Sequence, residues 1–528
     1  MRILVHPAIP AAAPRPPRPV ALDAVPGARL SEAIWLSGRF SPLPLCGGLG
    51  RCGRCRVRFL GDVPEPLPEE VEILGDAVHD GWRLACRRQI PDGEGTWEVR
   101  LFESVELPCA APVSPDPGKA RPGTGDLLLA VDLGTTSMAW RAMDMGGAIV
   151  AEGEELNPQA GAGGDVMSRL ALCAAGEGKR LAGLVRRRLA AITASLPGSV
   201  ARLVLAGNTA MTDIFLGLDI GGLCAAPYRV SHPGAETFPV EGLPDVTIPP
   251  LPGPFLGGDL SAGLVCLLAR GEKPPFVLAD MGTNGEFILM DGKGRLFFTS
   301  VPLGPALEGI GPECGRQAGP GTVTACSLSP FGVAMRLADG RDAKMAGAAG
   351  MSATGYLSLL AALVRAGALT PEGQFVDPQR AQPLARRLLA GLDRSRRVPR
   401  LVLAPGLWLS LDDVEEILKV KAAFSVALDL LLEAAGLAAG ELPAILLAGA
   451  LGHYVAPSDL ETLGFVPRGM AGRVRAVGNT SLEGAALLAL HPEKLGELAA
   501  TCAGAVLLQP ADDPSFHSRY IGAMRLGD

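Results

Sequence analysis

Short runs in which hydrophobic and polar positions alternate open the chain, and they predict strands around a single helix. The strands are expected at 1–9, 19–22, 55–60 and 97–102, and the helix is expected at 30–38. Short strands with one helix are typical of a small α+β domain, which we expect to span 1–103. The next segment, 104–125, carries five prolines and no hydrophobic period, which indicates a semi-rigid linker.

From residue 126 on, longer hydrophobic runs alternate with helical segments, which is the pattern of an α/β protein. Two pairs of segments look alike: 127–138 resembles 276–287, and 202–211 resembles 444–453. The same two signals in the same order predict a duplication into two lobes, 126–275 and 276–528. Buried strands followed by glycine turns also look alike without any duplication, and this alternative stays open.

The composition favours a globular protein with several domains. The chain has 528 residues, of which 48% are hydrophobic and 20% are charged. Its net charge of −7 provides no electrostatic footprint for nucleic acid, so we expect no nucleic-acid partner. Charged residues interrupt the longest apolar segments, and the N-terminus lacks the apolar stretch of a signal peptide. We therefore expect a cytoplasmic protein that does not enter a membrane.

The stretch CGGLGRCGRC at 46–55 fits two chemistries. Its glycines spell G-x-G-x-x-G, but a dinucleotide site needs a strand before this motif and a helix after it. Prolines precede the stretch and a strand-like alternation follows it, so the dinucleotide interpretation is disfavoured.

The cysteines of the same stretch fit a metal site better. Cys46, Cys52 and Cys55 have the spacing C-x5-C-x2-C, and Cys86 follows after thirty residues, which supplies the four thiolates of a [2Fe-2S] cluster. The glycines permit positive φ angles, so that backbone N–H groups can face the sulfurs. Zinc is the rival metal, but its structural sites generally use two paired cysteine knuckles, and the second half here has one cysteine. Cys109, in the linker, is the alternative fourth ligand.

The cysteine spacing, together with the LAC at 84–86 before a polar run, resembles the adrenodoxin-like and plant-like ferredoxins. This resemblance covers about a fifth of the chain. It implies a β-grasp fold and a [2Fe-2S] cluster for residues 1–103.

Two Asp-x-Gly-Thr turns are the candidates for nucleotide chemistry, because the chain has no P-loop motif. One runs from Asp132 to Thr136 and the other from Asp280 to Glu286, and each follows an apolar run. Such a turn offers backbone N–H and hydroxyl donors to phosphate, and its leading aspartate can hold Mg²⁺ through water. Two turns that face each other would grip a triphosphate from both sides. Ordinary turn formation is the alternative role for these residues.

These turns are similar to the phosphate motifs of the acetate and sugar kinase, Hsp70 and actin superfamily, and LAGALGH at 447–453 is similar to its adenosine motif. The resemblance implies duplicated, ribonuclease-H-like ATPase lobes. It assigns ATP and Mg²⁺ chemistry to three carboxylates, Asp132, Asp280 and Glu286. The implied nucleotide contacts are Gly134, Thr135, Thr136, Gly282, Thr283, Asn284, Gly449 and Gly452. Glu308 is a further candidate to orient water or bind metal, and the resemblance also puts Lys421 near nucleotide.

A ferredoxin domain joined through a linker to such an ATPase resembles one family, the reductive activators of corrinoid proteins. The segments 301–325, 411–436 and 478–490 are similar to signature text of that family. The resemblance implies an enzyme that uses ATP to drive an electron from its cluster onto an inactive Co(II) corrinoid, which restores Co(I) for methyl transfer. The implied partners are a corrinoid protein of a methyltransferase system, an upstream electron donor and a second copy of the chain in a homodimer.

Three other functions remain open from the sequence. The ATPase could activate another low-potential enzyme, or the chain could be a small-molecule kinase whose cluster only senses redox state. The third is a non-enzymatic electron carrier or a cobalamin-binding module that has lost hydrolysis. Cys314, in PECGRQ, is a candidate redox thiol, although a buried structural role fits it better.

Overall fold

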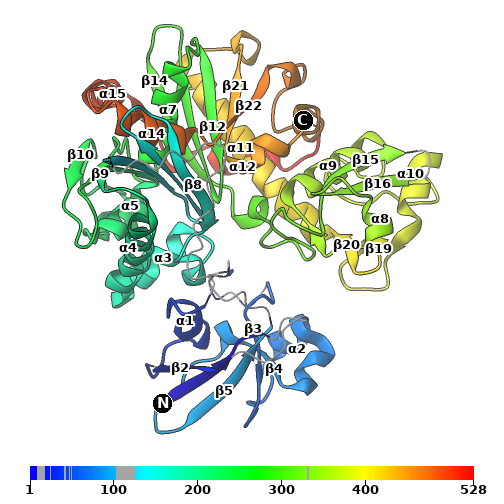
Figure 1. Ribbon diagram of the computed structural model, residues 1–528. Coiled ribbons are helices and arrows are strands. Elements are labelled where there is room, and N and C mark those ends of the chain that lie inside the picture. The colour runs from blue at the N-terminus through cyan, green and yellow to red at the C-terminus, as the bar shows by residue number, and fades with distance from the viewer. Residues whose placement is uncertain are drawn as a thin grey trace. The chain divides into compact units, whose positions relative to one another are not determined.

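The computed structural model (Figure 1) describes residues 1–8, 18–23, 25–40, 43, 45, 46, 48, 50, 52–102, 125–329 and 332–527. The chain divides into two compact units, one with residues 1–232 and 236–248 and the other with residues 233–235 and 249–528. Both units combine sheets with helices, so the expected α/β class is confirmed. None of the helices in the described part of the chain has the length and hydrophobicity needed to span a membrane.

The N-terminal part of the first unit is a five-stranded sheet in the order β2-β1-β5-β3-β4, drawn in blue in Figure 1. Its strands are β1 (Arg2–His6), β2 (Val20–Asp23), β3 (Arg56–Phe59), β4 (Trp82–Leu84) and β5 (Thr96–Leu101). Its helices are α1 (Leu30–Trp35) and α2 (Pro68–Leu74). Strands β1, β2, β3 and β5 and helix α1 lie where the alternation predicted them, because alternate side chains such as Ile3 and Val5 of β1 are fully buried. Strand β4 and helix α2 were not predicted.

The rest of the first unit is built on a six-stranded sheet in the order β10-β11-β9-β6-β7-β8. Strands β6, β7 and β8 form an antiparallel meander, and β9 runs parallel to β6. The strands are β6 (Leu127–Leu133), β7 (Ser137–Asp144), β8 (Ile149–Leu156), β9 (Val200–Gly207), β10 (Glu236–Phe238) and β11 (Val246–Ile248). The helices are α3 (Val166–Leu172), α4 (Gly178–Ser195), α5 (Thr209–Leu216) and α6 (Gly221–Cys224).

The second unit contains a six-stranded sheet with a similar plan, in the order β22-β21-β12-β13-β14-β23. Strands β12, β13 and β14 form an antiparallel meander, and β21 runs parallel to β12. The strands are β12 (Phe276–Met281), β13 (Asn284–Met290), β14 (Leu296–Pro302), β21 (Ile445–Ala448), β22 (Val474–Gly478) and β23 (Val506–Leu508). The helices around it are α7 (Gly258–Ala269), α11 (Leu411–Ala435), α12 (Gly449–Tyr454), α13 (Pro457–Leu463), α14 (Thr480–Leu490), α15 (Lys494–Ala503) and α16 (Phe516–Ala523).

An insertion between β14 and α11 contains two small three-stranded sheets that the sequence did not predict. One has the order β16-β15-β17 and the other the order β18-β19-β20. The strands are β15 (Thr322–Ser329), β16 (Gly332–Leu337), β17 (Gly350–Met351), β18 (Leu392–Asp393), β19 (Arg400–Ala404) and β20 (Leu407–Ser410). The helices are α8 (Ala343–Ala346), α9 (Ala353–Arg365) and α10 (Pro383–Leu388).

Helix α11 is the long helix that the apolar periodicity predicted. The side chain of Ser410 accepts a hydrogen bond from the Asp413 backbone, and Asp413 bonds back to Ser410, which makes a capping box at its start. The helix ends at Ala435, and the next residue, Gly436, caps it with a left-handed backbone. Its buried Phe424 packs edge-on against the rings of Phe287 and Phe465 and so joins α11 to the central sheet.

Candidate functional site

Neighbouring strands bring two of the four predicted cluster cysteines together. Cys55 immediately precedes β3, and Cys86 lies in a 3₁₀ turn directly after β4. Because β3 and β4 are antiparallel, with Arg56 opposite Leu84, these two cysteines lie at the same end of the strand pair. The Ala85 backbone N–H donates to the Cys55 carbonyl at 3.1 Å, which fixes this junction.

The four thiols interact as two pairs. The Cys52 thiol donates to Cys46, and this bond, together with burial, raises the pKa of Cys52 far above its usual range. The Cys55 thiol donates to Cys86, which raises the pKa of Cys55 and lowers that of Cys86. The Gly50 backbone N–H also bonds to the Cys86 sulfur and lowers its pKa further. The loop therefore already directs a backbone donor at a sulfur, as expected for a cluster loop.

The loop conformation fits an iron–sulfur cluster, although the cysteines are not preassembled around one point. Gly48, Gly50 and Gly53 all have positive φ angles, between 63° and 85°, which a residue with a side chain adopts only with strain. Among the described residues, no three Cys, His, Asp or Glu side chains already have the arrangement of a metal site. Three thiols on a glycine-rich loop and a fourth on the turn after β4 remain the donor set that a cluster requires. Cys109 lies outside the described residues.

In the first unit, the turn after Asp132 is held by buried polar side chains that sequence reasoning missed. The Asn157 amide donates to the Gly134 carbonyl at 2.6 Å, and its backbone N–H donates to the Thr136 carbonyl at 2.8 Å. The guanidinium of Arg169, which is fully buried, donates to the Thr135 carbonyl. The signal available in the sequence was that Arg169 is the single charged residue of helix α3. These contacts give the Gly-Thr-Thr turn a defined shape.

In the second unit, the turn after Asp280 brings carboxylates together. Asp280 on β12 and Glu286 on β13 are directly opposite each other in the antiparallel ladder. Like charges in opposite positions repel, and a hard cation such as Mg²⁺ would relieve this repulsion. The Thr283 hydroxyl donates to a Glu308 carboxylate oxygen at 2.6 Å. Glu308 therefore supports the turn that joins β12 to β13.

The predicted adenosine motif lies beside this turn. Strand β21 is parallel to β12 with Ala448 opposite Asp280, so Gly449 follows at the same edge of the sheet. Gly449 has a φ of +79°, and a methyl group placed on it would lie 3.1 Å from the Asp280 Oδ1 atom. A methyl group on Gly452 would lie 2.7 Å from the Leu447 carbonyl oxygen. Glycine at both positions therefore permits a close approach of the α12 backbone to β12 and β21.

The structure gives Lys421 and Cys314 roles in packing. Lys421 is 1% exposed, and its ammonium donates to the carbonyls of Ala523 and Arg525 at 3.0 Å. It therefore ties α11 to the C-terminal segment. Burial raises the pKa of the Cys314 thiol to about 11, which makes it a poor nucleophile near neutral pH.

Two models of one family match consecutive parts of the chain. The RACo middle region matches residues 127–269, and the C-terminal ASKHA domain of RACo matches residues 275–528. A solved structure of a reductive activator for corrinoid, iron-sulfur protein aligns with 100% of this chain and 98% of its own, with a TM-score of 0.66 and 19% identity. At that identity the match shows a shared fold.

Curated relatives agree with the family models. The corrinoid activation enzyme RamQ of Eubacterium limosum is 28% identical over 428 residues, which cover 76% of this chain and 70% of RamQ. The [Co(II) methylated amine-specific corrinoid protein] reductase of Methanosarcina barkeri is 25% identical over 336 residues, 57% of each chain. A component of the Na(+)-translocating NADH-quinone reductase of Actinobacillus succinogenes is 35% identical over 80 residues, 15% of this chain and 17% of its own. The family predicted from the sequence is confirmed: the chain belongs to the RACo family of corrinoid-protein activators and carries the ASKHA domain of that family.

Proposed function

We propose that this protein uses ATP to drive an electron from a [2Fe-2S] cluster onto the Co(II) of a corrinoid protein, which regenerates Co(I) for methyl transfer. The observation that carries this proposal is the match of both RACo models along the chain. Upstream of those regions, the chain has four interacting cysteine thiols. The reaction would take place in the cytoplasm, where thiols stay reduced.

The cluster would be held by Cys46, Cys52, Cys55 and Cys86 in a β-grasp domain at residues 1–103. When bound, it would supply a reversible one-electron store. The sheet order β2-β1-β5-β3-β4 with helix α1 supports this fold, since β1 pairs parallel with β5 and antiparallel with β2. The similarity to a component of an NADH-quinone reductase supports a role in electron transfer.

The nucleotide would be held by two lobes that arose by duplication, at 126–275 and 276–528. The similar plan of the two six-stranded sheets supports this duplication. Asp280 and Glu286 would hold the hydrated Mg²⁺ of ATP, with Asp132 acting from the other lobe. The glycines and polar side chains of both turns would bind phosphate, and they are Gly134, Thr135, Thr136, Gly282, Thr283 and Asn284. Gly449 and Gly452 would let the adenosine lie against the backbone at the start of α12.

ATP is needed because the electron transfer is uphill. A plant-type [2Fe-2S] centre has a reduction potential of roughly −400 mV, and we expect the Co(II)/Co(I) couple to lie lower. Binding and hydrolysis of ATP shift this balance only if the nucleotide-bound state interacts differently with the corrinoid partner. An upstream donor must then re-reduce the cluster, and we expect the chain to work as a homodimer.

Anaerobic reconstitution with a corrinoid protein tests the proposal. The cobalt absorbance of the Co(II) form is expected to convert to that of Co(I) only with ATP and a reductant. Asp280→Asn is expected to abolish the conversion, whereas Asp339→Asn, which changes an exposed carboxylate in the turn after β16, is expected to leave it intact. Conversion without ATP would refute the ATP requirement. Phosphorylation of a small molecule at a rate independent of cluster reduction would favour the kinase alternative.

A further inference from the structure

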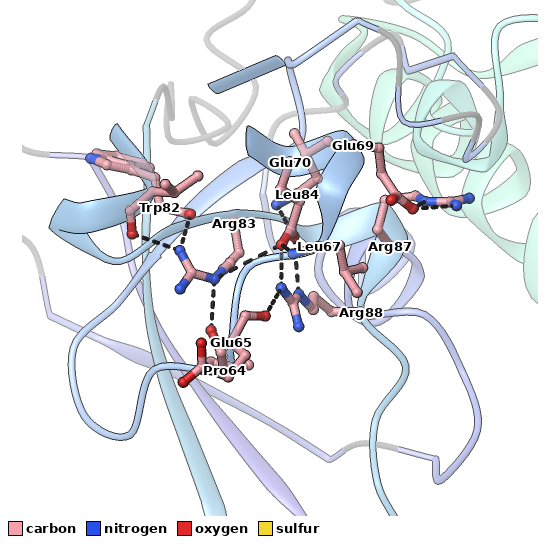
Figure 2. Close-up of polar contacts among 11 residues, drawn as sticks. Pro64, Glu65, Leu67, Glu69, Glu70, Trp82, Arg83, Leu84, Arg87 and Arg88 are labelled. Atoms are coloured by element: carbon pink, nitrogen blue, oxygen red, sulfur yellow. Dashed lines mark hydrogen bonds and ion pairs between the residues drawn. The ribbon is translucent and has the colours of Figure 1, made fainter. Parts of the chain in front are cut away.

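A fully buried carboxylate lies close to the turn that carries Cys86. Glu70, on α2, has no exposed surface, and its nearest charged neighbours are Arg83 and Arg88 (Figure 2). A buried carboxylate persists only where hydrogen bonds and opposite charges replace its lost hydration. The contacts of Glu70 therefore show which segments of the chain the buried carboxylate holds together.

One oxygen of Glu70 closes the turn around Cys86. Its Oε1 atom accepts a hydrogen bond from the Leu84 backbone N–H at 2.9 Å and another from the Arg88 Nε at 3.0 Å. Leu84 and Arg88 lie two residues before and two residues after Cys86, and Figure 2 shows both directed at the same carboxylate. One acceptor atom thus holds both ends of the segment that presents the Cys86 thiol.

The second oxygen ties this turn to the start of α2. The Oε2 atom accepts from the Leu67 backbone N–H at 2.9 Å and from the Arg88 guanidinium. Arg88 also donates to the Glu65 carbonyl at 2.7 Å. Arg83 lies farther away, with its Nε atom 3.9 Å from Oε2, and donates mainly to backbone carbonyls, which include that of Pro64 at 2.8 Å.

Helix α2 also touches the loop that carries the other cysteines. A methyl group on Gly53, which lies between Cys52 and Cys55, would be 3.2 Å from Ile73 Cγ2 on α2. The same short helix therefore contacts the loop through Ile73 and the Cys86 turn through Glu70. It thus links the segment that carries Cys86 to the loop that carries Cys52 and Cys55.

We propose that Glu70 and Arg88 are positioning residues that hold Cys86 in its ligating place, and that their buried charge tunes the reduction potential of the cluster. This inference rests on the proposed function, because it assumes that a cluster is bound. Two arginines and one carboxylate give the buried group a net charge of +1. A positive charge beside the cluster favours the reduced form, which carries one more negative charge.

The adjacent Arg87 provides a matched control. It also flanks Cys86, but its ion pair with Glu69 is a surface contact, with the two side chains 39% and 35% exposed. The Cγ and Cδ atoms of Arg87 lie beside Gly50 of the cysteine loop, and glutamine keeps a carbon at both positions. Solvent screens such a pair. Removal of Arg87 therefore changes the formal charge by the same amount as removal of Arg88, without opening the buried network.

The experiment compares Arg88→Gln, Arg88→Lys and Arg87→Gln in the full chain after anaerobic loading with iron and sulfide. Arg88→Gln is expected to release its iron to a chelator about 10- to 100-fold faster than the wild type, and to have a lower midpoint potential. Arg88→Lys keeps the charge but loses the fork of donors, so faster release is expected at a nearly unchanged potential. Arg87→Gln is expected to match the wild type in iron release and to shift the potential less than Arg88→Gln does.

The outcomes separate this inference from the proposed function. A wild-type chain that takes up no cluster would overturn both. A wild-type cluster with equal iron release and equal potential in Arg88→Gln and Arg87→Gln would overturn both the positioning role and the tuning of the potential, and would leave the proposed function standing. Circular dichroism shows whether Arg88→Gln folds. If it does not, Arg88→Lys provides the test, because wild-type iron release in Arg88→Lys would refute the positioning role of the guanidinium.

Discussion

Replacing Gly449 by alanine tests whether the close approach of α12 to Asp280 matters for ATP. Gly449 has a φ of +79°, and the added methyl carbon would lie 3.1 Å from the Asp280 Oδ1 atom. Two effects are therefore expected. The left-handed backbone destabilises alanine relative to glycine, and the methyl group displaces the carboxylate.

The two effects have different magnitudes and different readouts. Left-handed backbone strain costs about 1–2 kcal/mol for a non-glycine residue, which lowers the melting temperature by about 2–8 °C in a domain of this size. The carboxylate has to move by about 0.5 Å to restore an ordinary van der Waals separation. Since a displacement of about 1 Å in a reacting site costs about 100-fold in rate, we expect about a tenfold loss of ATP turnover.

Gly436→Ala is the control, because it carries the same strain without the contact. Gly436 has a φ of +68° at the end of α11, and nothing lies within 4 Å of the position of an added methyl group. Both variants are assayed by thermal unfolding and by phosphate release with Mg²⁺ and ATP. Equal ATP turnover in the two variants, at similar losses of stability, would refute the role given to the contact between Gly449 and Asp280.

Three further predictions concern other parts of the chain. Burial raises the pKa of Asp413 from 3.8 to about 6, so its contribution to stability is present below about pH 4 and is lost as the pH rises through 6. Between about pH 4 and pH 6 the melting temperature of the wild type is expected to fall relative to that of Asp413→Asn. Melting temperatures that change in parallel with pH in the two proteins would contradict this expectation. Phe424→Ala removes a fully buried ring packed 5.1 and 5.6 Å from two others and is expected to cost about 3–5 kcal/mol in urea unfolding; a loss below about 1 kcal/mol would show that the core refills the space. Cys86→Ala is expected to abolish the visible and paramagnetic signals after iron and sulfide loading, whereas Cys109→Ala keeps them; the opposite result would reassign the fourth ligand.

Local features of the fold were predictable because they depend on residues close together in the chain. The alternation in the first strand predicted β1, and the apolar period after Ser410 predicted α11 almost to its last residue. The two Asp-x-Gly-Thr turns begin in the last two residues of β6 and β12, as their apolar runs predicted. By contrast, the small strands of the insertion at 322–410 were not predicted, since buried and exposed positions alternate irregularly along them, as in β15 and β19.

The side chains that hold the candidate sites in place were the hardest feature to predict from the sequence. Asn157 and Arg169 hold the turn after Asp132, yet neither belongs to a motif. Lys421 was expected near nucleotide by resemblance, whereas the structure gives it two backbone carbonyls more than 100 positions along the chain. A side chain's role depends on what packs around it, and distant segments decide this.

The sequence by itself determined the spacing of the cysteines, the strand and helix periods and the glycine-rich turns, because each is a pattern written in neighbouring residues. Only the tertiary structure decided which of these segments come into contact. The pairing of β12 with β21 brings Gly449 to Asp280, and the packing of α2 against the turn after β4 buries Glu70 beside Arg88. Burial and long-range contact arise from the packing of the whole chain, so the environment of a carboxylate or a thiol follows from the folded structure.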